Sequence, residues 1–221
     1  LVLIVAYEGC RYLARVLGMP TYAGVLVGLS YALSPRLLGA SGVITGEATP
    51  ASLLPWLLLP LVLAPRGRRD PRAAGVLSGV GRLLMGGVNA VGTLAMVPAG
   101  LCVVLANLRQ PGGRGLAGWW ATGLALATAW WMVPLLMLGK YSPPFLDFIE
   151  TAAATTSSTG WSNSVRGADH WVAYSEMNGR PWWPGSHMLV TEPTLIIVSS
   201  LVAARPNVTR SISSRGRPAA T

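Results

Sequence analysis

Two carboxylates, Asp147 and Glu150, lie three residues apart in the segment 140–171. Two prolines at 143 and 144 end the preceding apolar helix, and the spacing then places both carboxylates on one face of a short predicted helix. Such a pair can bind a divalent cation, accept hydrogen bonds from sugar hydroxyls or take a proton from one. A solvated helix face carries the same pattern, so both interpretations stay open.

Two further polar residues interrupt apolar stretches. Glu47 lies in a predicted loop rich in Gly, Ser and Thr, just before a helix expected to start at Pro50. It could contact a sugar or stabilise that helix start. Asn89 follows two glycines at 86 and 87 and could line a cavity or end a helix.

Among the cations, Arg36 and Arg166 could hold a phosphate, because a guanidinium makes paired bonds to phosphate oxygens. Both could equally lie at the level of lipid headgroups. Arg82 falls inside an apolar run, where a charge is costly unless it is paired or beside water, so it is a further candidate. A helix lying in the membrane interface would make Arg82 ordinary.

His170 beside Asp169 could be an oriented base, but the sequence shows no third partner and a structural role is favoured. The sequence contains no His and Cys cluster with metal-ligand spacing, no phosphate-binding glycine loop and no nucleophile elbow. It therefore gives no support to a metal-dependent hydrolase or a nucleotide-driven pump. A divalent cation at the carboxylate pair is the one cofactor left open.

The composition is that of a membrane protein, with 52% apolar and 11% charged residues in 221. The segment 116–139 holds no charge and is long enough to cross a bilayer, which takes roughly 20 helical residues. The net charge of +9 does not indicate nucleic acid, because the arginines are not interleaved with stacking aromatic residues. The chain starts at Leu1 with no basic region before its apolar start, so we expect a fragment of a longer protein.

The apolar segments predict an all-α, polytopic transmembrane helical bundle. We expect the end of a span at 1–7, a polar connector at 8–15, a helix at 21–33 and a loop at 34–49. A kinked or partly unwound helix at 51–64, with two prolines inside it, should follow. Two shorter helices within 73–107 should meet at a break near 86–89. The span 116–139 and a weaker apolar run at 187–204 complete the domain.

The predicted domain division is a membrane domain at 1–204, with an extracytoplasmic loop at 140–186, and a basic, disordered tail at 205–221. Most arginines fall in the segments 8–15, 66–72, 109–114 and 205–217, whereas the other connections carry more carboxylates than cations. By the positive-inside rule the arginine-rich segments are cytoplasmic. Glu47, the turn at 86–89 and the loop at 140–171 would then share the outer side.

Four stretches resemble one family: YALSPR at 31–36, LPWLLLPL at 54–61, MGGVNA at 85–90 and YSPPFLDFIE at 141–150. With the dipeptides at 166–167 and 170–171, they are similar to the membrane region of the actinobacterial alpha-(1->3)-arabinofuranosyltransferases. This resemblance implies a glycosyltransferase of the GT-C architecture in the plasma membrane, with its active face extracytoplasmic. The implied donor is decaprenylphosphoryl arabinose, and the implied acceptor is the arabinan of arabinogalactan or lipoarabinomannan.

Under this resemblance, Asp147 and Glu150 would position the acceptor or a cation, Glu47 and Asn89 would contact sugar, and Arg36 or Arg166 would approach the phosphate. The principal catalytic carboxylate of GT-C enzymes usually follows the first helix, and here it would lie before the first residue. The chain alone is therefore expected to be inactive. A non-catalytic scaffold of a cell-wall enzyme, a transferase that uses a polyprenyl-phosphate mannose and, less favoured, a lipid flippase remain alternatives.

Overall fold

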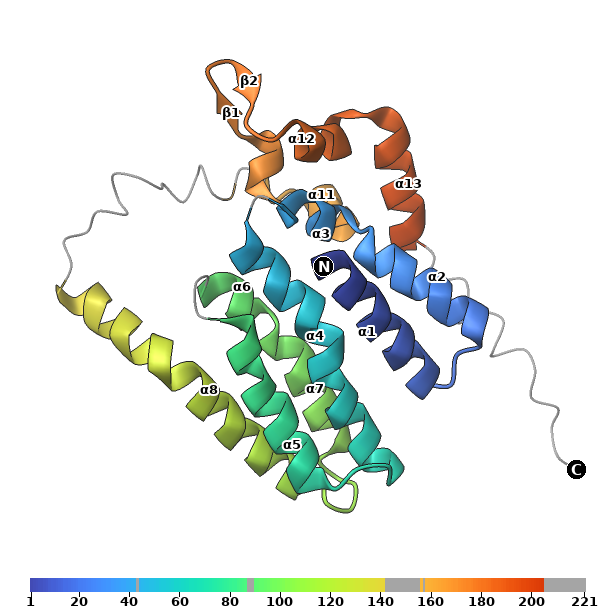
Figure 1. The fold of residues 1–221 in the computed structure, drawn as a ribbon, viewed down its shortest axis with the longest axis vertical. Coiled ribbons are helices and arrows are strands. Elements are labelled where there is room, and N and C mark those ends of the chain that lie inside the picture. Colours follow the sequence, from blue (N-terminus) through green and yellow to red (C-terminus); the bar gives the residue numbers. More distant parts are fainter. Residues whose placement is uncertain (43, 87–89, 142–155, 157, 205–221) are drawn as a thin grey trace, which may run out of the picture. The chain divides into compact units, whose positions relative to one another are not determined.

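The computed structural model describes residues 1–42, 44–86, 90–141, 156 and 158–204, and these residues are mostly helical (Figure 1). The chain forms two compact units. The first unit comprises Leu1–Leu33 and Ala40–Ile149, and the second comprises Ser34–Gly39 and Glu150–Thr221.

The first unit is a bundle of α-helices with two 3-10 turns. Its elements are α1 (Val2–Val16), α2 (Thr21–Ala32), α4 (Thr45–Leu63), η1 (Ala64–Arg66), α5 (Pro71–Val80), η2 (Gly81–Met85), α6 (Ala90–Ala95), α7 (Val97–Asn107) and α8 (Gly113–Tyr141). The start of α5 follows directly from its sequence. Asp70 accepts a hydrogen bond from the Ala73 N–H at 2.9 Å, and Pro71 occupies the first helical position, where no N–H is needed.

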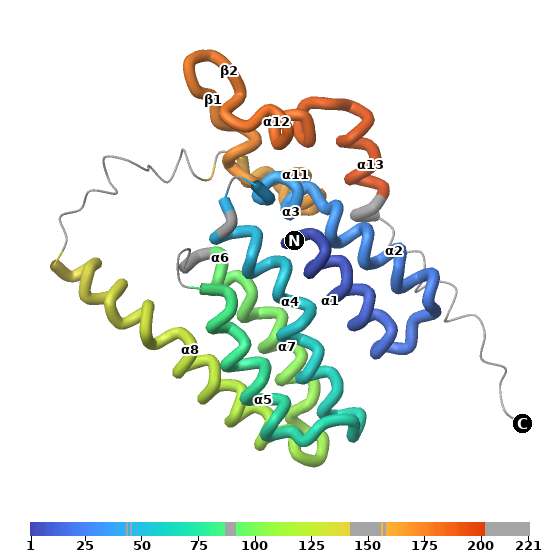
Figure 2. The backbone as a smooth tube through the Cα atoms, viewed as in Figure 1, coloured from blue at the N-terminus to red at the C-terminus, as the bar shows by residue number. Residues whose placement is uncertain are grey.

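Helix α5 packs against α8 at very short range because both helices carry glycine at the contact (Figure 2). A Cβ atom added to Gly79 would lie 2.7 Å from backbone atoms of Gly123, and one added to Gly75 would lie 2.8 Å from the Trp120 backbone nitrogen. Small residues let two helix backbones approach closely, which favours dispersion contacts where water provides no hydrophobic driving force. Next to this contact lies the buried apolar core formed by Leu61, Ala64, Ala74, Val104, Leu116 and Trp120.

Helix α4 is continuous although it contains Pro50, Pro55 and Pro60. A proline lacks the N–H that would bond the carbonyl four residues earlier, so Pro55 leaves the Ala51 carbonyl without its helical donor. The hydroxyl of Tyr31, from α2, donates to that carbonyl at 2.6 Å. Of the two forms expected for 51–64, partial unwinding is wrong, whereas the expected compensation by a neighbouring helix is found at the Ala51 carbonyl.

Two other expectations, for residues 8–15 and 34–49, are wrong. Residues 8–15 form no connector, since α1 continues to Val16 and Arg11 pairs with Glu8 at 2.5 Å along the helix. The loop expected at 34–49 instead contains α3 (Pro35–Ala40) and the first turn of α4. The helices predicted at 21–33 and 116–139 are confirmed in position, and η2 ends at Met85, just before the break expected near 86–89.

Two described helical stretches, Gly46–Arg66 and Gly113–Tyr141, are long and apolar enough to cross a membrane. Thr21–Ala32 and Gly92–Asn107 are shorter apolar helices.

The second unit combines short helices with one hairpin. Its elements are α3, α11 (Trp161–Arg166), η3 (Trp171–Tyr174), β1 (Glu176–Met177), β2 (Arg180–Pro181), α12 (Pro184–Thr191) and α13 (Pro193–Ala204). The strands are antiparallel, and Asn178 and Gly179 connect them with φ of 54° and 69°, the conformation of a type I′ turn. Within this unit the buried Ser186 hydroxyl donates to the Gly39 carbonyl at 2.8 Å and ties α12 to α3.

Candidate functional site

The second unit contains a polar cluster around Asp169. The Arg36 guanidinium lies 3.5 Å from one carboxylate oxygen of Asp169, and the Ser164 hydroxyl lies 3.5 Å from the other. Arg36 comes from α3 and Ser164 from α11, so two elements far apart in the sequence deliver these groups to one carboxylate. At 3.5 Å the pair is loose, and a phosphate oxygen could compete with the carboxylate for Arg36.

Arg166 lies next to this cluster, and its two terminal guanidinium nitrogens differ in their hydrogen bonding. Its Nη2 donates to the Asn163 side chain at 2.8 Å, and Asn163 in turn donates to the Ser158 carbonyl at 3.2 Å. Its Nη1 is buried and has no hydrogen-bond partner in the part of the chain that the structure describes. An unsatisfied buried donor is costly, so this nitrogen is available to an acceptor that enters the site.

The Tyr174 hydroxyl closes one side of the cluster by donating to the Ala168 carbonyl at 3.0 Å. Burial raises the pKa of this phenol, the positive charge of Arg166 lowers it, and the negative charge of Asp169 raises it. Tyr174 is therefore neutral at physiological pH and acts here as a donor that positions the backbone.

The two histidines have structural partners. His170 is buried, and its Nδ1 accepts a hydrogen bond from the Val172 N–H at 3.3 Å, at the start of η3. The His187 Nδ1 lies 3.0 Å from the Ala173 carbonyl. The structural role that the sequence favoured for His170 agrees with this geometry.

Glu47 lies in the first turn of α4 and is half-buried. Its expected placement in a loop before a helix at Pro50 is wrong, because α4 begins five residues earlier, at Thr45. Glu47 is the third residue of α4, and a carboxylate in the first turn interacts favourably with the helix dipole. Helix α4 contacts both η2 and α6, so the helix that carries Glu47 contacts the elements on both sides of residues 87–89, which lie outside the described residues.

Arg82 is 4% exposed in η2 and lies inside the bundle of the first unit. Its Nη2 donates to the Thr93 carbonyl, whereas its buried Nε has no partner among the described residues. Thr93 lies near the end of α6, where a cation interacts favourably with the helix dipole. A cavity of about 10 Å³, lined by Arg82 and Ser78 among others, has room for roughly one water beside this guanidinium.

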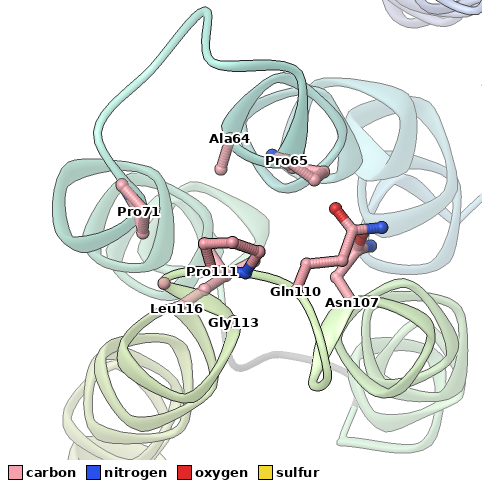
Figure 3. A pocket seen from close by; sticks show the side chains of 9 residues that line it. Ala64, Pro65, Pro71, Asn107, Gln110, Pro111, Gly113 and Leu116 are labelled. Atoms are coloured by element: carbon pink, nitrogen blue, oxygen red, sulfur yellow. The ribbon is translucent and has the colours of Figure 1, made fainter.

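Two further cavities among the described residues of the first unit differ in size and lining. One lies between the segments 64–71 and 107–116, ringed by Pro65, Pro71 and Pro111 (Figure 3), and at about 10 Å³ it is too small for a sugar. A groove of about 570 Å³ follows α4, α5 and η2, lined by apolar side chains and Arg69. That size and lining suit a hydrocarbon chain.

Three predicted site residues, Asn89, Asp147 and Glu150, lie outside the described residues, as does the helix predicted to carry the carboxylate pair. Of the other three, Arg36 and Arg166 belong to the second unit and Glu47 to the first. In residues 1–42, 44–86, 90–141, 156 and 158–204, no three His, Cys, Asp or Glu side chains gather closely enough to hold a metal ion.

The sequence did not reveal the pairing of Arg36 with Asp169. The two residues are 133 positions apart, so no spacing or periodicity connects them. Asn163 and Ser164 were also missed. Their position in a polar segment beside Arg166 was the only available signal.

Comparison with known proteins gives a consistent result. A sequence model of a family described as "Alpha-(1->3)-arabinofuranosyltransferase, N-terminal GT-C domain" matches residues 1–206. Alpha-(1->3)-arabinofuranosyltransferase of Mycolicibacterium smegmatis is 37% identical over 205 residues, which are 92% of this chain and 14% of that protein. The protein of the same name from Mycobacterium tuberculosis is 39% identical over 206 residues, 91% of this chain and again 14% of the relative.

Solved structures give the same relationship. The cryo-EM structure of the arabinofuranosyltransferase AftD from Mycobacteria superposes with a TM-score of 0.65 at 31% identity, and the match covers 100% of this chain and 18% of that one. The chain thus spans a small part of the length of the relatives it matches, and the helical bundle has the GT-C fold of their membrane region.

Proposed function

The chain belongs to the alpha-(1->3)-arabinofuranosyltransferase family, within its N-terminal GT-C domain, and on that premise we propose that it forms part of a membrane glycosyltransferase. The reaction transfers an arabinofuranosyl group from a lipid-linked donor to a polysaccharide acceptor. The observation that carries this proposal is the family match over residues 1–206.

The proposed donor is decaprenylphosphoryl arabinose, and the proposed acceptor is the arabinan of arabinogalactan or lipoarabinomannan. An acceptor hydroxyl oxygen attacks the anomeric carbon, and the bond from that carbon to the phosphate oxygen breaks. A carboxylate takes the hydroxyl proton, and the electron pair of the broken bond stays on the departing polyprenyl phosphate. Attack opposite the leaving group inverts the anomeric centre.

The proposed roles of the site residues follow from their chemistry. Asp147 and Glu150 position the acceptor or a bound divalent cation, and Glu47 and Asn89 contact sugar. For the phosphate, the buried Nη1 of Arg166 has no hydrogen-bond partner among the described residues, which supports a role for that guanidinium, and Arg36 is the second proposed phosphate ligand.

The proposed location is the plasma membrane, crossed several times, with the active face extracytoplasmic. Two features support this location. The described part of the chain has two helices long enough to span a bilayer, and arginines concentrate in the segments 66–72 and 109–114, which connect helices of the first unit and are cytoplasmic by the positive-inside rule.

The test is transfer by the full-length protein with Asp147→Asn, measured with a labelled donor and a short arabinan acceptor. We expect transfer to fall at least about tenfold at unchanged expression, since amides do not accept protons at neutral pH. Asp70→Asn is the matched control, because Asp70 caps α5 and asparagine caps as well as aspartate. Unchanged transfer by Asp147→Asn would remove Asp147 from the site.

A chelator tests the proposed cation separately. Transfer that disappears with a chelator and returns with added Mg²⁺ supports a cation at the carboxylate pair. Transfer that is insensitive to the chelator leaves positioning of the acceptor as the role of the two carboxylates.

A further inference from the structure

An exposed pair of tryptophans lies at the base of the hairpin in the second unit. Trp171 begins η3 and Trp182 follows β2, and their ring centroids are 5.3 Å apart with the planes inclined by 31°. Each residue remains 39% exposed. The two indoles therefore contact each other and still present ring surface to the outside.

The surrounding structure holds this tryptophan pair in place. Trp171 stacks on the buried His170 ring at 6.2 Å and 16°, and His170 is itself fixed by the Val172 N–H. The backbone N–H of Trp182 donates to the Ser175 carbonyl at 2.9 Å, which adds one hydrogen bond at the open end of the hairpin and fixes the backbone that carries this indole. A ligand that contacts these rings loses little affinity to ordering them, because they are already positioned.

The chemistry beside the tryptophan pair suits a sugar ring. Arg180, two residues before Trp182 and therefore on the same face of the hairpin, is exposed and can donate hydrogen bonds. A sugar ring carries polarised C–H bonds on its face and hydroxyl groups around its rim. The negative face of an indole attracts those C–H bonds, while charged side chains bind the hydroxyl groups.

We propose that the tryptophan pair Trp171 and Trp182 is a binding subsite for furanose rings of the acceptor polysaccharide. A sugar ring stacks on the exposed indole surface, with Arg180 donating hydrogen bonds to its hydroxyl groups. The identity of the sugar rests on the proposed function. The rival occupant is the membrane interface, where tryptophans also concentrate.

The test measures oligosaccharide binding rather than catalysis. The full-length protein in detergent is titrated with a synthetic arabinofuranose hexasaccharide and no donor, and saturation-transfer NMR reports contacts to the sugar protons. Trp182→Leu keeps an apolar side chain but removes the indole face, and it should raise Kd about tenfold, as for truncation of a binding hot spot. Trp182→Phe should retain most of the affinity.

Trp161→Leu is the matched control, since Trp161 belongs to the same unit, is 87% exposed and should leave Kd unchanged. A Trp182→Leu protein that melts like the wild type and binds the hexasaccharide equally well overturns the proposal. Loss of fluorescence quenching by brominated phospholipids in Trp182→Leu, with Kd unchanged, assigns the pair to the membrane interface instead. Because no donor is present, a failure of arabinose transfer would leave this result intact.

Discussion

The hydrogen bond from Tyr31 to the Ala51 carbonyl predicts an energetic coupling between Tyr31 and Pro55. Pro55 cannot donate to the carbonyl four residues earlier, and the Tyr31 hydroxyl reaches that carbonyl at 2.6 Å. Tyr31→Phe should leave a carbonyl without a donor in an apolar bundle, which costs about 1–3 kcal/mol. In a Pro55→Ala background the restored backbone N–H at position 55 can donate to the Ala51 carbonyl, so Tyr31→Phe should then cost less than about 1 kcal/mol.

The assay is reversible unfolding in mixed detergent micelles for the wild type, both single variants and the double variant. We expect a coupling energy of about 1–2 kcal/mol, because each single change alters the donor supply to one carbonyl. Tyr22→Phe, on the same helix and 71% exposed, is the matched control and should be near neutral. If Tyr31→Phe costs the same in both backgrounds, the hydroxyl does not replace the missing N–H and this explanation of α4 is refuted.

Two further predictions concern packing and pH. Gly79→Ala should destabilise the first unit by about 1–2 kcal/mol, since the added Cβ would lie 2.7 Å from the backbone of α8. Gly118→Ala is the control and should stabilise the protein by up to about 1 kcal/mol, because its added Cβ would have nothing within 4 Å. Equal shifts in melting temperature for the two variants would contradict the close contact. Burial raises the pKa of Tyr174 above its ordinary value of 10.0, so the stability that its neutral phenol supplies is present below pH 10 and falls as pH rises through the folded-state pKa. Unfolding followed against pH should show this loss in the wild type and a flatter profile in Tyr174→Phe, and identical profiles would argue against a raised pKa of Tyr174.

Sequence patterns predicted the elements whose signals are local. The uncharged run at 116–139 predicted α8, and the glycines near 86 predicted the end of η2. The continuity of α4 was not predictable in the same way, because the group that compensates for Pro55 lies 20 residues away on another helix. The Asn178-Gly179 dipeptide did carry a hairpin signal that was missed, since strands of two residues show no alternation.

The candidate site was predicted only in part. Residue type alone identified Arg36 and Arg166 as anion-binding candidates, but the role of Asp169 as the partner of Arg36 depends on tertiary structure. Glu47 was recognised as notable and misplaced in a loop, because Pro50 suggested a later helix start than the one at Thr45. Proline is tolerated in the first turns of a helix as well as at its first position, so it marks the start only within several residues.

Sugar transfer by the full-length protein tests the central claim most directly. Membranes that contain the protein are supplied with labelled decaprenylphosphoryl arabinose or, in parallel, with the corresponding mannosyl donor, together with a short arabinan acceptor. The proposed function predicts transfer from the arabinosyl donor alone, with the Asp147→Asn variant at least about tenfold slower. Transfer from the mannosyl donor alone, or from neither donor, would contradict it.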